Sequence, residues 1–218
     1  MSSAPWKMVV APGARPCNHQ EMTASRAASA ASTAASHSAM AKAMTDPMIR
    51  PARPDDAAAL AVLGRQTFVD TFADGFGIPY PADDLAAFLD KSFSVETLQT
   101  KLAEPGAAWW VADRDGQILG FANTGPNTLP HPDAQPSHAE LRRLYIGRDA
   151  QGLGLGTKLL KLALEWMEAN TDGPMWIGVW SGNEKAQKLY AAYGFEKAGE
   201  YDYPVGAWND REFILRRG

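Results

Sequence analysis

The chain has 218 residues, and its hydrophobic content of 45% is enough to form the core of one globular domain with extra segments. The formal net charge of −4 does not suggest a nucleic-acid partner, and no apolar run reaches the ~20 residues that a membrane-spanning helix needs. The single cysteine, Cys17, excludes an intramolecular disulfide framework, and the 4 histidines lack the spacing of a metal site.

Residues 1–47 differ in composition from the rest of the chain. Residues 23–43 are mostly Ala, Ser, Thr and Met, so they can bury little apolar surface to offset their ordering entropy. The alanine content allows a frayed helix near residues 27–44, and polar residues interrupt every candidate core of a secretory peptide. We predict a disordered or low-complexity leader over 1–47, or a later start at Met44 or Met48. A folded, cytoplasmic domain is expected over residues 48–218.

The first half of this domain is predicted to be mainly helical. Residues 48–52 form a short edge-type strand, because the nitrogen of Pro51 cannot donate to a ladder. A helix opens at residues 54–56, with acidic residues in its first turn, where the helix dipole favours them. Further helices are predicted from apolar spacing at residues 83–91, capped by Asp83, and at residues 95–104, capped by Ser94.

The second half alternates strands and helices. Strands are predicted at residues 107–112, 117–123, 138–146, 175–180, 195–203 and 211–216. The first two are joined by a hairpin turn, and helices are predicted at residues 157–167 and 184–193. This order predicts one mixed sheet with helices on both faces.

A glycine-dense run lies between a predicted strand and a predicted helix, and it consists of Gln151, Gly152, Leu153, Gly154, Leu155 and Gly156. Glycine lacks a Cβ, so its backbone can approach a ligand closely, and the first turn of a helix favours an anion. A Walker A loop would need Lys where Thr157 stands, and a dinucleotide fingerprint would need Gly there. The remaining interpretations are a phosphate-binding loop of the pattern Gln-x-x-Gly-x-Gly and a glycine-rich turn without a ligand.

That loop is followed by Asn183-x-x-Ala186-x-x-x-Tyr190-x-x-x-Gly194-Phe195. Together the two segments resemble the adjacent signature segments of the GNAT superfamily of N-acetyltransferases, and the resemblance covers residues 48–217. Within that superfamily, residues 67–72, 141–146 and 176–180 resemble polyamine acetyltransferases of the PaiA type. The leader has no counterpart in either group.

The resemblance implies an α/β fold with a central mixed, mostly antiparallel sheet, helices on both faces and a V-shaped splay between two parallel strands, at residues 141–146 and 176–180. It also implies that acetyl-CoA, the acetyl donor, lies in this splay. The backbone of Leu144 and Ile146, together with Asn183, would bind the pantetheine arm. Asn183 is equally expected as a helix cap. The N–H groups from Gln151 to Gly156 would bind the pyrophosphate.

The resemblance also implies candidate catalytic residues. Tyr190 matches the family tyrosine beside the thioester sulfur, where a phenol with an ordinary pKa near ~10 can protonate the leaving thiolate. The alternative is a tyrosine that only packs on the sheet. Glu140 could deprotonate an ammonium substrate directly or through water, and the alternative is a solvated glutamate at a strand end. His138 is a second candidate base.

The acceptor is predicted from residues 68–84, because loops between the first helices shape the acceptor pocket in the resembled family. Carboxylates among aromatic rings suit a cationic amine, and the alternative is that they are helix caps and surface charges. The residues concerned are Asp70, Asp74, Asp83, Asp84, Phe72, Phe76 and Tyr80.

We therefore predict an acetyl-CoA-dependent N-acetyltransferase that acts by direct attack of a primary amine, with a polyamine or another small amine as its partner. No membrane or nucleic-acid partner is expected, and no acyl-cysteine, because the domain has no cysteine. The alternatives are a protein N-terminal or lysine acetyltransferase, a non-catalytic acetyl-CoA-binding module, and a domain that binds no cofactor. Folds of the resembled kind often form homodimers, but the residues do not fix the oligomeric state.

Overall fold

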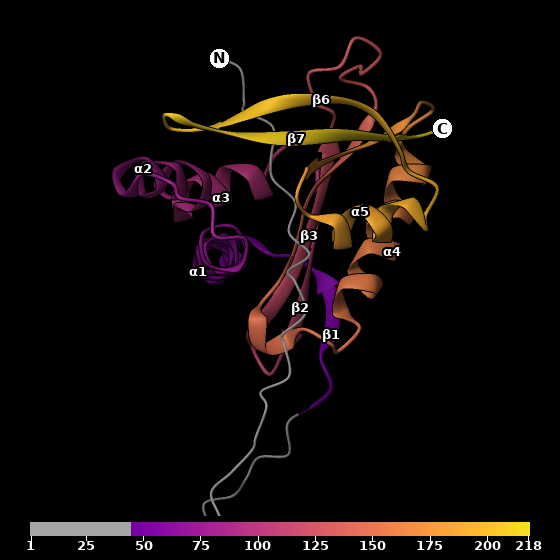
Figure 1. Cartoon of the computed structure of the whole chain (residues 1–218). Helices are drawn as coiled ribbons and strands as arrows, with labels where there is room; N and C mark the ends of the chain where they lie inside the picture. Colours follow the sequence, from indigo (N-terminus) through magenta and orange to yellow (C-terminus); the bar gives the residue numbers. More distant parts are fainter. Residues whose placement is uncertain (1–44) are drawn as a thin grey trace, which may run out of the picture.

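The computed structural model describes residues 45–218, and Figure 1 shows how their helices and strands are arranged. Apart from residues 45–47, which form neither helix nor strand, the predicted leader lies outside the described residues. The same holds for the helix expected near residues 27–44 and for Cys17.

Within the described residues, seven strands form one sheet in the order β1-β2-β3-β4-β5-β7-β6. β4 and β5 pair in parallel, and all other neighbours pair antiparallel. The strands are β1 (Met48–Pro51), β2 (Ala108–Arg114), β3 (Gln117–Pro126), β4 (Ala139–Ile146), β5 (Met175–Trp180), β6 (Glu196–Val205) and β7 (Trp208–Arg217). The predicted mixed, mostly antiparallel sheet is confirmed, and so is the edge position of the strand that contains Pro51.

Helices cover both faces of this sheet, as predicted (Figure 1). One face carries α1 (Ala57–Phe68), α2 (Ala82–Phe93) and α3 (Val95–Leu102), and the other carries α4 (Leu155–Asn170) and α5 (Glu184–Ala191). Shorter helical segments are η1 (Pro54–Asp56), the π-helical η2 (Val69–Gly75) and η3 (Arg148–Ala150). No helix among residues 45–218 combines the length and the apolar character needed to cross a membrane.

Two helix starts differ from the sequence prediction. α4 begins at Leu155 instead of Thr157, because Gly154 takes a left-handed conformation (φ 74°) at the N-cap and the helix starts directly after it. The N-cap of α2 is Pro81, so the prediction that Asp83 caps this helix is wrong, and Asp83 lies in the first turn. Both starts depend on backbone angles that the residue pattern does not reveal.

β4 separates two hydrophobic cores because its side chains alternate between the faces of the sheet. Leu141 and Leu144 belong to the core under α4 and α5. Tyr145 belongs to the core under α1, α2 and α3. The strand is almost completely buried. Side chains on the two faces of this strand therefore meet different helices.

The parallel strands β4 and β5 part after three residue pairs, which are Ala139 with Met175, Glu140 with Trp176 and Leu141 with Ile177. Among the described strands, the rest of β4 pairs only with β3, and the rest of β5 pairs only with β7. The parting begins at a bulge, because Arg142 is an extra residue that the register with β3 skips. The predicted V-shaped splay is therefore present.

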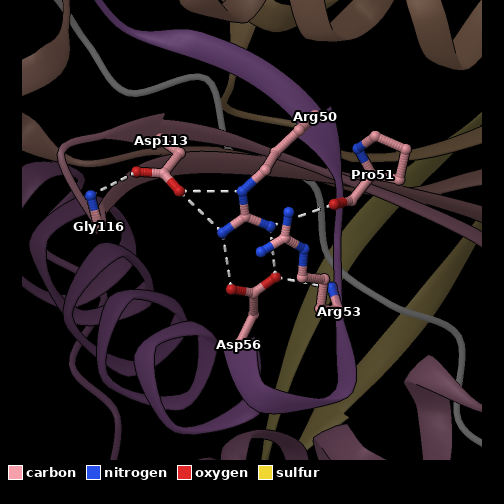
Figure 2. A network of polar contacts seen from close by, with 6 residues as sticks. All are labelled: Arg50, Pro51, Arg53, Asp56, Asp113 and Gly116. Carbon is pink, nitrogen blue, oxygen red and sulfur yellow. Dashed lines mark hydrogen bonds and ion pairs between the residues drawn. The ribbon is translucent and has the colours of Figure 1, made fainter. Parts of the chain in front are cut away.

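An ion-pair network joins the sheet edge to the start of the helical layer (Figure 2). Arg50 in β1 donates two hydrogen bonds to the Asp56 carboxylate, at 2.7 and 2.9 Å, and one from Nε to Asp113 Oδ2, at 2.9 Å. Asp56 also accepts from the backbone N–H of Arg53, at 2.6 Å. The hydrogen bonds to Asp56, mainly that from Arg50, hold the pKa of this carboxyl below its ordinary value. The network therefore fixes the entry into α1.

Replacement of Arg50 by methionine is expected to lower the free energy of unfolding by about 2 kcal/mol at neutral pH, because charge-assisted hydrogen bonds are lost. The lowered pKa of Asp56 stabilises the fold above the ordinary aspartate pKa of about 3.9, and this contribution disappears as the pH falls through the lowered value. Urea unfolding at pH 7 and near pH ~3 should therefore show a difference that shrinks in acid.

The control is Arg65→Met, which breaks the exposed ion pair with Asp90 and should cost less than about 1 kcal/mol. An Arg50→Met penalty that stays constant from neutral to acid pH would contradict the assigned network.

Candidate functional site

The glycine loop presents open backbone at the N-terminus of α4. Gly152 and Gly154 have φ angles of 83° and 74°, in the left-handed region that favours glycine. A Cβ added at either position would meet no heavy atom within 4 Å, so the space above the loop is open. The helix starts immediately afterwards, and its first N–H groups and dipole favour an anion. The loop therefore has the geometry of an anion-binding site.

A cavity of about 550 Å³ lies between this loop, the end of β4 and α5. Of the residues predicted to bind the donor, its lining includes Ile146, Gln151, Gly152, Gly154, Leu155 and Gly156. Leu153 is 45% exposed and does not line the cavity, and the Leu144 side chain is buried in the core under α4. Most of the predicted donor residues therefore meet around one cavity.

The sequence prediction missed a basic contribution from α5. Lys185 and Lys188 also line the cavity, together with Leu189 and Thr157. Lys188 forms an ion pair with Glu184 at 3.3 Å, but both side chains are exposed, so the pair is weak. Two lysines three residues apart lie on one side of a helix, and this spacing in the sequence would have indicated a basic patch.

Asn183 caps α5, as predicted. Its Oδ1 accepts a hydrogen bond from the Ala186 N–H at 3.1 Å, and the residue is 1% exposed. Its Nδ2 is buried and has no hydrogen-bond partner among the described residues. Because a buried amide donor normally has a partner, this atom is suited to a carbonyl oxygen of a ligand. Capping and ligand contact are thus compatible.

Tyr190 is fully buried in the core between α4, α5 and the sheet. Its ring packs edge-on against Phe195 at 6.5 Å, and it does not line the cavity. Burial raises the pKa of the phenol above its ordinary value, so the phenol stays protonated at neutral pH. The packing role is therefore present, and the role as proton donor stays a prediction.

Glu140 is also fully buried, so the alternative of a solvated glutamate is wrong. Its Oε2 accepts hydrogen bonds from the N–H and the hydroxyl of Thr128, at 2.7 and 2.8 Å. Its Oε1 has no hydrogen-bond partner among the described residues. Burial raises the pKa of this carboxyl, and the nearby Arg142 guanidinium opposes that rise. Glu140 thus has one held oxygen and one that can accept a proton.

His138 is less suited to act as the base. Its Nδ1 accepts hydrogen bonds from the Trp176 indole and from the Gln135 N–H, both at 3.1 Å. Its ring also stacks on that of Trp176, with an interplanar angle of 10°. These contacts assign His138 a role in holding the loop against β5.

The aspartates predicted for the acceptor pocket lie at the surface or only partly buried. Asp70 accepts a hydrogen bond from Gln66 at 2.8 Å, and Asp84 accepts one from the Ala207 N–H at 2.8 Å. The acidic residues that are deeply buried beside the predicted aromatic residues are instead Asp210 and Glu212 in β7. Sequence reasoning missed them, although two carboxylates at alternate positions of a strand share one face.

A metal site is not indicated, since residues 45–218 contain no group of three or more potential ligands that could hold an ion.

Comparisons with known proteins agree with this geometry. The profile of the acetyltransferase (GNAT) family matches residues 66–195, which is more than half of the chain. An uncharacterized N-acetyltransferase of Lactobacillus delbrueckii subsp. lactis is 29% identical over 148 residues, covering 68% of this chain and 86% of the relative. One of Mycobacterium tuberculosis is 28% identical over 166 residues, covering 74% and 97%.

Solved structures share the fold. The PaiA N-acetyltransferase from Thermoplasma acidophilum, in complex with coenzyme A, has a TM-score of 0.63 at 19% identity, covering 79% of this chain and 99% of that one. The ribosomal-protein-alanine N-acetyltransferase from Brucella melitensis has a TM-score of 0.55 at 22% identity, covering 78% and 98%. Only the second name states an acceptor, a ribosomal protein, and at this level of identity the shared fold does not choose the acceptor of this chain.

Proposed function

Because the chain belongs to the acetyltransferase (GNAT) family, whose members are acetyl-CoA-dependent acyltransferases, we propose that it acetylates a small primary amine by direct attack. One observation carries the proposal. β4 and β5 part beyond Leu141 and Ile177, so that a cavity with a glycine loop lies at one side of the splay and the buried Glu140 carboxylate lies on the opposite face of the sheet.

The residues of the donor side fit acetyl-CoA, which supplies the acetyl group as a thioester. The open N–H groups of the glycine loop would hold its pyrophosphate, and Lys185 and Lys188 would add positive charge across the cavity. The orphan Nδ2 of Asn183 would donate to the pantetheine arm, as would the unpaired edge of β4 at Leu144 and Ile146.

The proton movements would be shared between two buried residues. Glu140 would take a proton from the acceptor ammonium at Oε1, directly or through water. Tyr190 would give its phenolic proton to the departing thiolate, because its raised pKa keeps that proton in place at neutral pH. Backbone N–H groups freed by the bulge at Arg142 would polarise the carbonyl oxygen.

A polyamine or another small amine is the proposed acceptor. Buried carboxylates and aromatic rings gather on the acceptor face, and they suit a cation. The resemblance of residues 67–72, 141–146 and 176–180 to polyamine acetyltransferases of the PaiA type supports this choice, and a PaiA N-acetyltransferase shares the fold. The fold shared with a ribosomal-protein-alanine N-acetyltransferase keeps a protein N-terminus as the second candidate.

The test is a calorimetric titration with acetyl-CoA, followed by a panel of amines in which released CoA is measured. We expect saturable binding, and CoA release with spermidine, spermine or a simpler alkylamine. Release only with a peptide N-terminus would support the second candidate, and binding without transfer to any acceptor would support a non-catalytic module. The absence of acetyl-CoA binding would overturn the proposal.

Removal of the Glu140 carboxylate tests the base. A base must be ionised, so kcat/KM should rise as the pH increases through the raised pKa of Glu140, and Glu140→Gln should remove this acidic limb. Thr128→Val deletes a hydrogen bond that favours the charged carboxylate, so it should move the limb to higher pH. The measurement is the pH–rate profile of each variant. An acidic limb that is unchanged in Glu140→Gln would show that another residue is the base.

A further inference from the structure

A second cavity lies between the C-terminal end of α3 and the bulge of β4. Its volume is about 640 Å³, and it shares no lining residue with the cavity beside the glycine loop. α3 lies with α1 and α2 in one helical layer (Figure 1). The lining residues are Thr97, Thr100, Lys101, Ala103, Glu104, Pro105 and Arg142. The cavity is therefore separate from the proposed donor site.

Arg142 is almost completely buried in this lining, with 3% of its surface exposed. Its Nη1 donates to Glu104 Oε2 at 2.8 Å, and its Nη2 donates to the Pro126 carbonyl at 2.6 Å. Its Nε–H has no hydrogen-bond partner among the described residues. Because a buried donor normally has an acceptor, this N–H is suited to an acceptor atom that a ligand supplies.

The position of the Arg142 guanidinium is fixed by its surroundings. A Cβ added at Gly125 of β3 would lie 2.9 Å from Arg142 Cζ, so the glycine leaves room for the guanidinium beside the strand. Arg142 is also the residue that the register of β4 with β3 skips, so its backbone forms the bulge and its side chain lines the cavity. A charged group that is already held in place needs little further ordering when a ligand binds, and this favours affinity.

Lys101 brings a second positive charge to the cavity. Burial, followed by the charge of Arg143, lowers the pKa of the Lys101 ammonium to about 8, and the charge of Glu104 opposes this change. The ammonium is therefore still largely protonated at pH 7. The lining contains two cationic side chains and one carboxylate, so its net formal charge is +1. This charge complements a ligand with one negative charge better than it complements a phosphate dianion.

Other polar groups at this end of α3 are engaged with the backbone. The hydroxyls of Thr97 and Thr100 donate to backbone carbonyls, at 3.2 and 3.0 Å. The N–H of Ala103 donates to the Gln99 carbonyl at 3.2 Å, so part of the negative end of the helix is covered. The charged donors of the lining are thus Arg142 and Lys101.

We propose that this cavity binds the carboxylate of a small aliphatic acid, which accepts hydrogen bonds from Arg142 Nε and from the Lys101 ammonium. Charged donors and a charged acceptor form the stronger class of hydrogen bond, and Ala103 and Pro105 supply an apolar part of the lining for the aliphatic chain. Two sources can supply the group, namely a separate acid and an acceptor that carries a carboxylate besides its amine. The inference does not rest on the proposed function, because carboxylate binding requires no acetyl transfer.

The test is a calorimetric titration of butyrate into the full chain, with butyramide as the uncharged probe of the same length. We expect saturable binding of butyrate that is at least about 10-fold tighter than that of butyramide. Lys101→Gln and Arg142→Lys should each weaken butyrate binding about 10-fold or more, because each removes a charge-assisted hydrogen bond. The control is Lys161→Gln, which changes an exposed lysine of α4 and should leave the Kd for butyrate unchanged.

Lys101→Gln keeps the contacts of Arg142 with Glu104 and Pro126, so a folding defect in Arg142→Lys does not decide the test. The absence of butyrate binding, or equal binding of butyrate and butyramide, overturns the site. Tighter binding of inorganic phosphate that Lys101→Gln removes overturns the choice of a carboxylate.

The pKa of Lys101 gives a second readout that does not require turnover. A bound anion favours the protonated amine, so saturating butyrate should raise this pKa above its value of about 8. A pH titration of the lysine side chains by NMR measures the change, and Lys101→Gln identifies the signal. A Lys101 pKa that saturating butyrate leaves unchanged would show that the acid binds outside this cavity.

Steady-state kinetics distinguish the two sources of the carboxylate. With an amine that the chain acetylates, competitive inhibition by butyrate against the amine assigns the cavity to a carboxylate of the acceptor. A pattern that is not competitive assigns it to a separate acid. When no amine is acetylated the proposed function fails, and the calorimetric and NMR results still decide whether the carboxylate site exists.

Discussion

Replacement of Tyr190 by phenylalanine is expected to lower kcat by about 10²- to 10³-fold, because a positioned proton donor contributes by that order. The phenol is fully buried, and phenylalanine keeps the ring that packs against Phe195. The KM for acetyl-CoA and the Tm should therefore change little, so the loss lies in the chemical step. Steady-state kinetics with saturating amine, together with thermal unfolding, measure both quantities.

The raised pKa of Tyr190 adds a prediction for the pH profile. Because the pKa of the Tyr190 phenol lies above its ordinary value, the phenol keeps its proton and kcat should not fall between neutral pH and pH ~9. The reduction of kcat in Tyr190→Phe should therefore be constant over this pH range. Tyr193→Phe is the matched control, because Tyr193 follows the end of α5 and packs, partly buried, against the same core. Native-like turnover by the Tyr190→Phe variant would show that this tyrosine packs in the core and does not donate a proton.

Substitution of Gly154 by valine is expected to weaken acetyl-CoA binding by about 100-fold or more, which corresponds to the loss of one or two charge-assisted hydrogen bonds. A Cβ at this position projects into the open space above the loop, where the pyrophosphate would lie. The left-handed backbone angle, φ 74°, adds strain for any residue with a Cβ. Calorimetric titration with acetyl-CoA measures the change.

A variant of a second glycine distinguishes the effect of backbone strain from the loss of a contact with acetyl-CoA. Gly116, in the turn between β2 and β3, has φ 88° and also meets no atom within 4 Å when a Cβ is added. Gly116→Val should therefore lower the Tm to a similar extent and leave the Kd for acetyl-CoA unchanged. Equal affinity in the two valine variants would show that the loop does not contact the donor.

The sheet was predictable because most of its strands have strong local patterns. The run from Met175 to Trp180 is uniformly apolar, and it forms the buried strand β5 with the expected bounds. The early start of α4 and the π-helical continuation of α1 were not predictable, because both depend on backbone angles rather than on hydrophobic spacing. The types of the helices and strands were therefore predictable from the sequence, and their boundaries were less predictable.

The local geometry of the proposed donor side follows from the sequence itself. Gln151, Gly154 and Gly156 lie within six consecutive residues at the start of α4, and Asn183 is the N-cap of the short helix α5 that contains Tyr190, so local spacing defines where these groups lie. The two lysines of α5 also follow from local spacing, and they line the same cavity. Contiguous residues encode such a site because the helix and the turn fix their relative positions.

Only the tertiary structure decided which residues are buried on the proposed acceptor side. The insertion of β7 between β5 and β6 brings Asp210 and Glu212 to rings that precede them by more than a hundred residues, such as Tyr80. The same packing buries Glu140, whereas the aspartates near the aromatic residues in sequence stay at or near the surface. Residue order does not specify which distant strands become neighbours, because that outcome depends on how the whole sheet buries its faces.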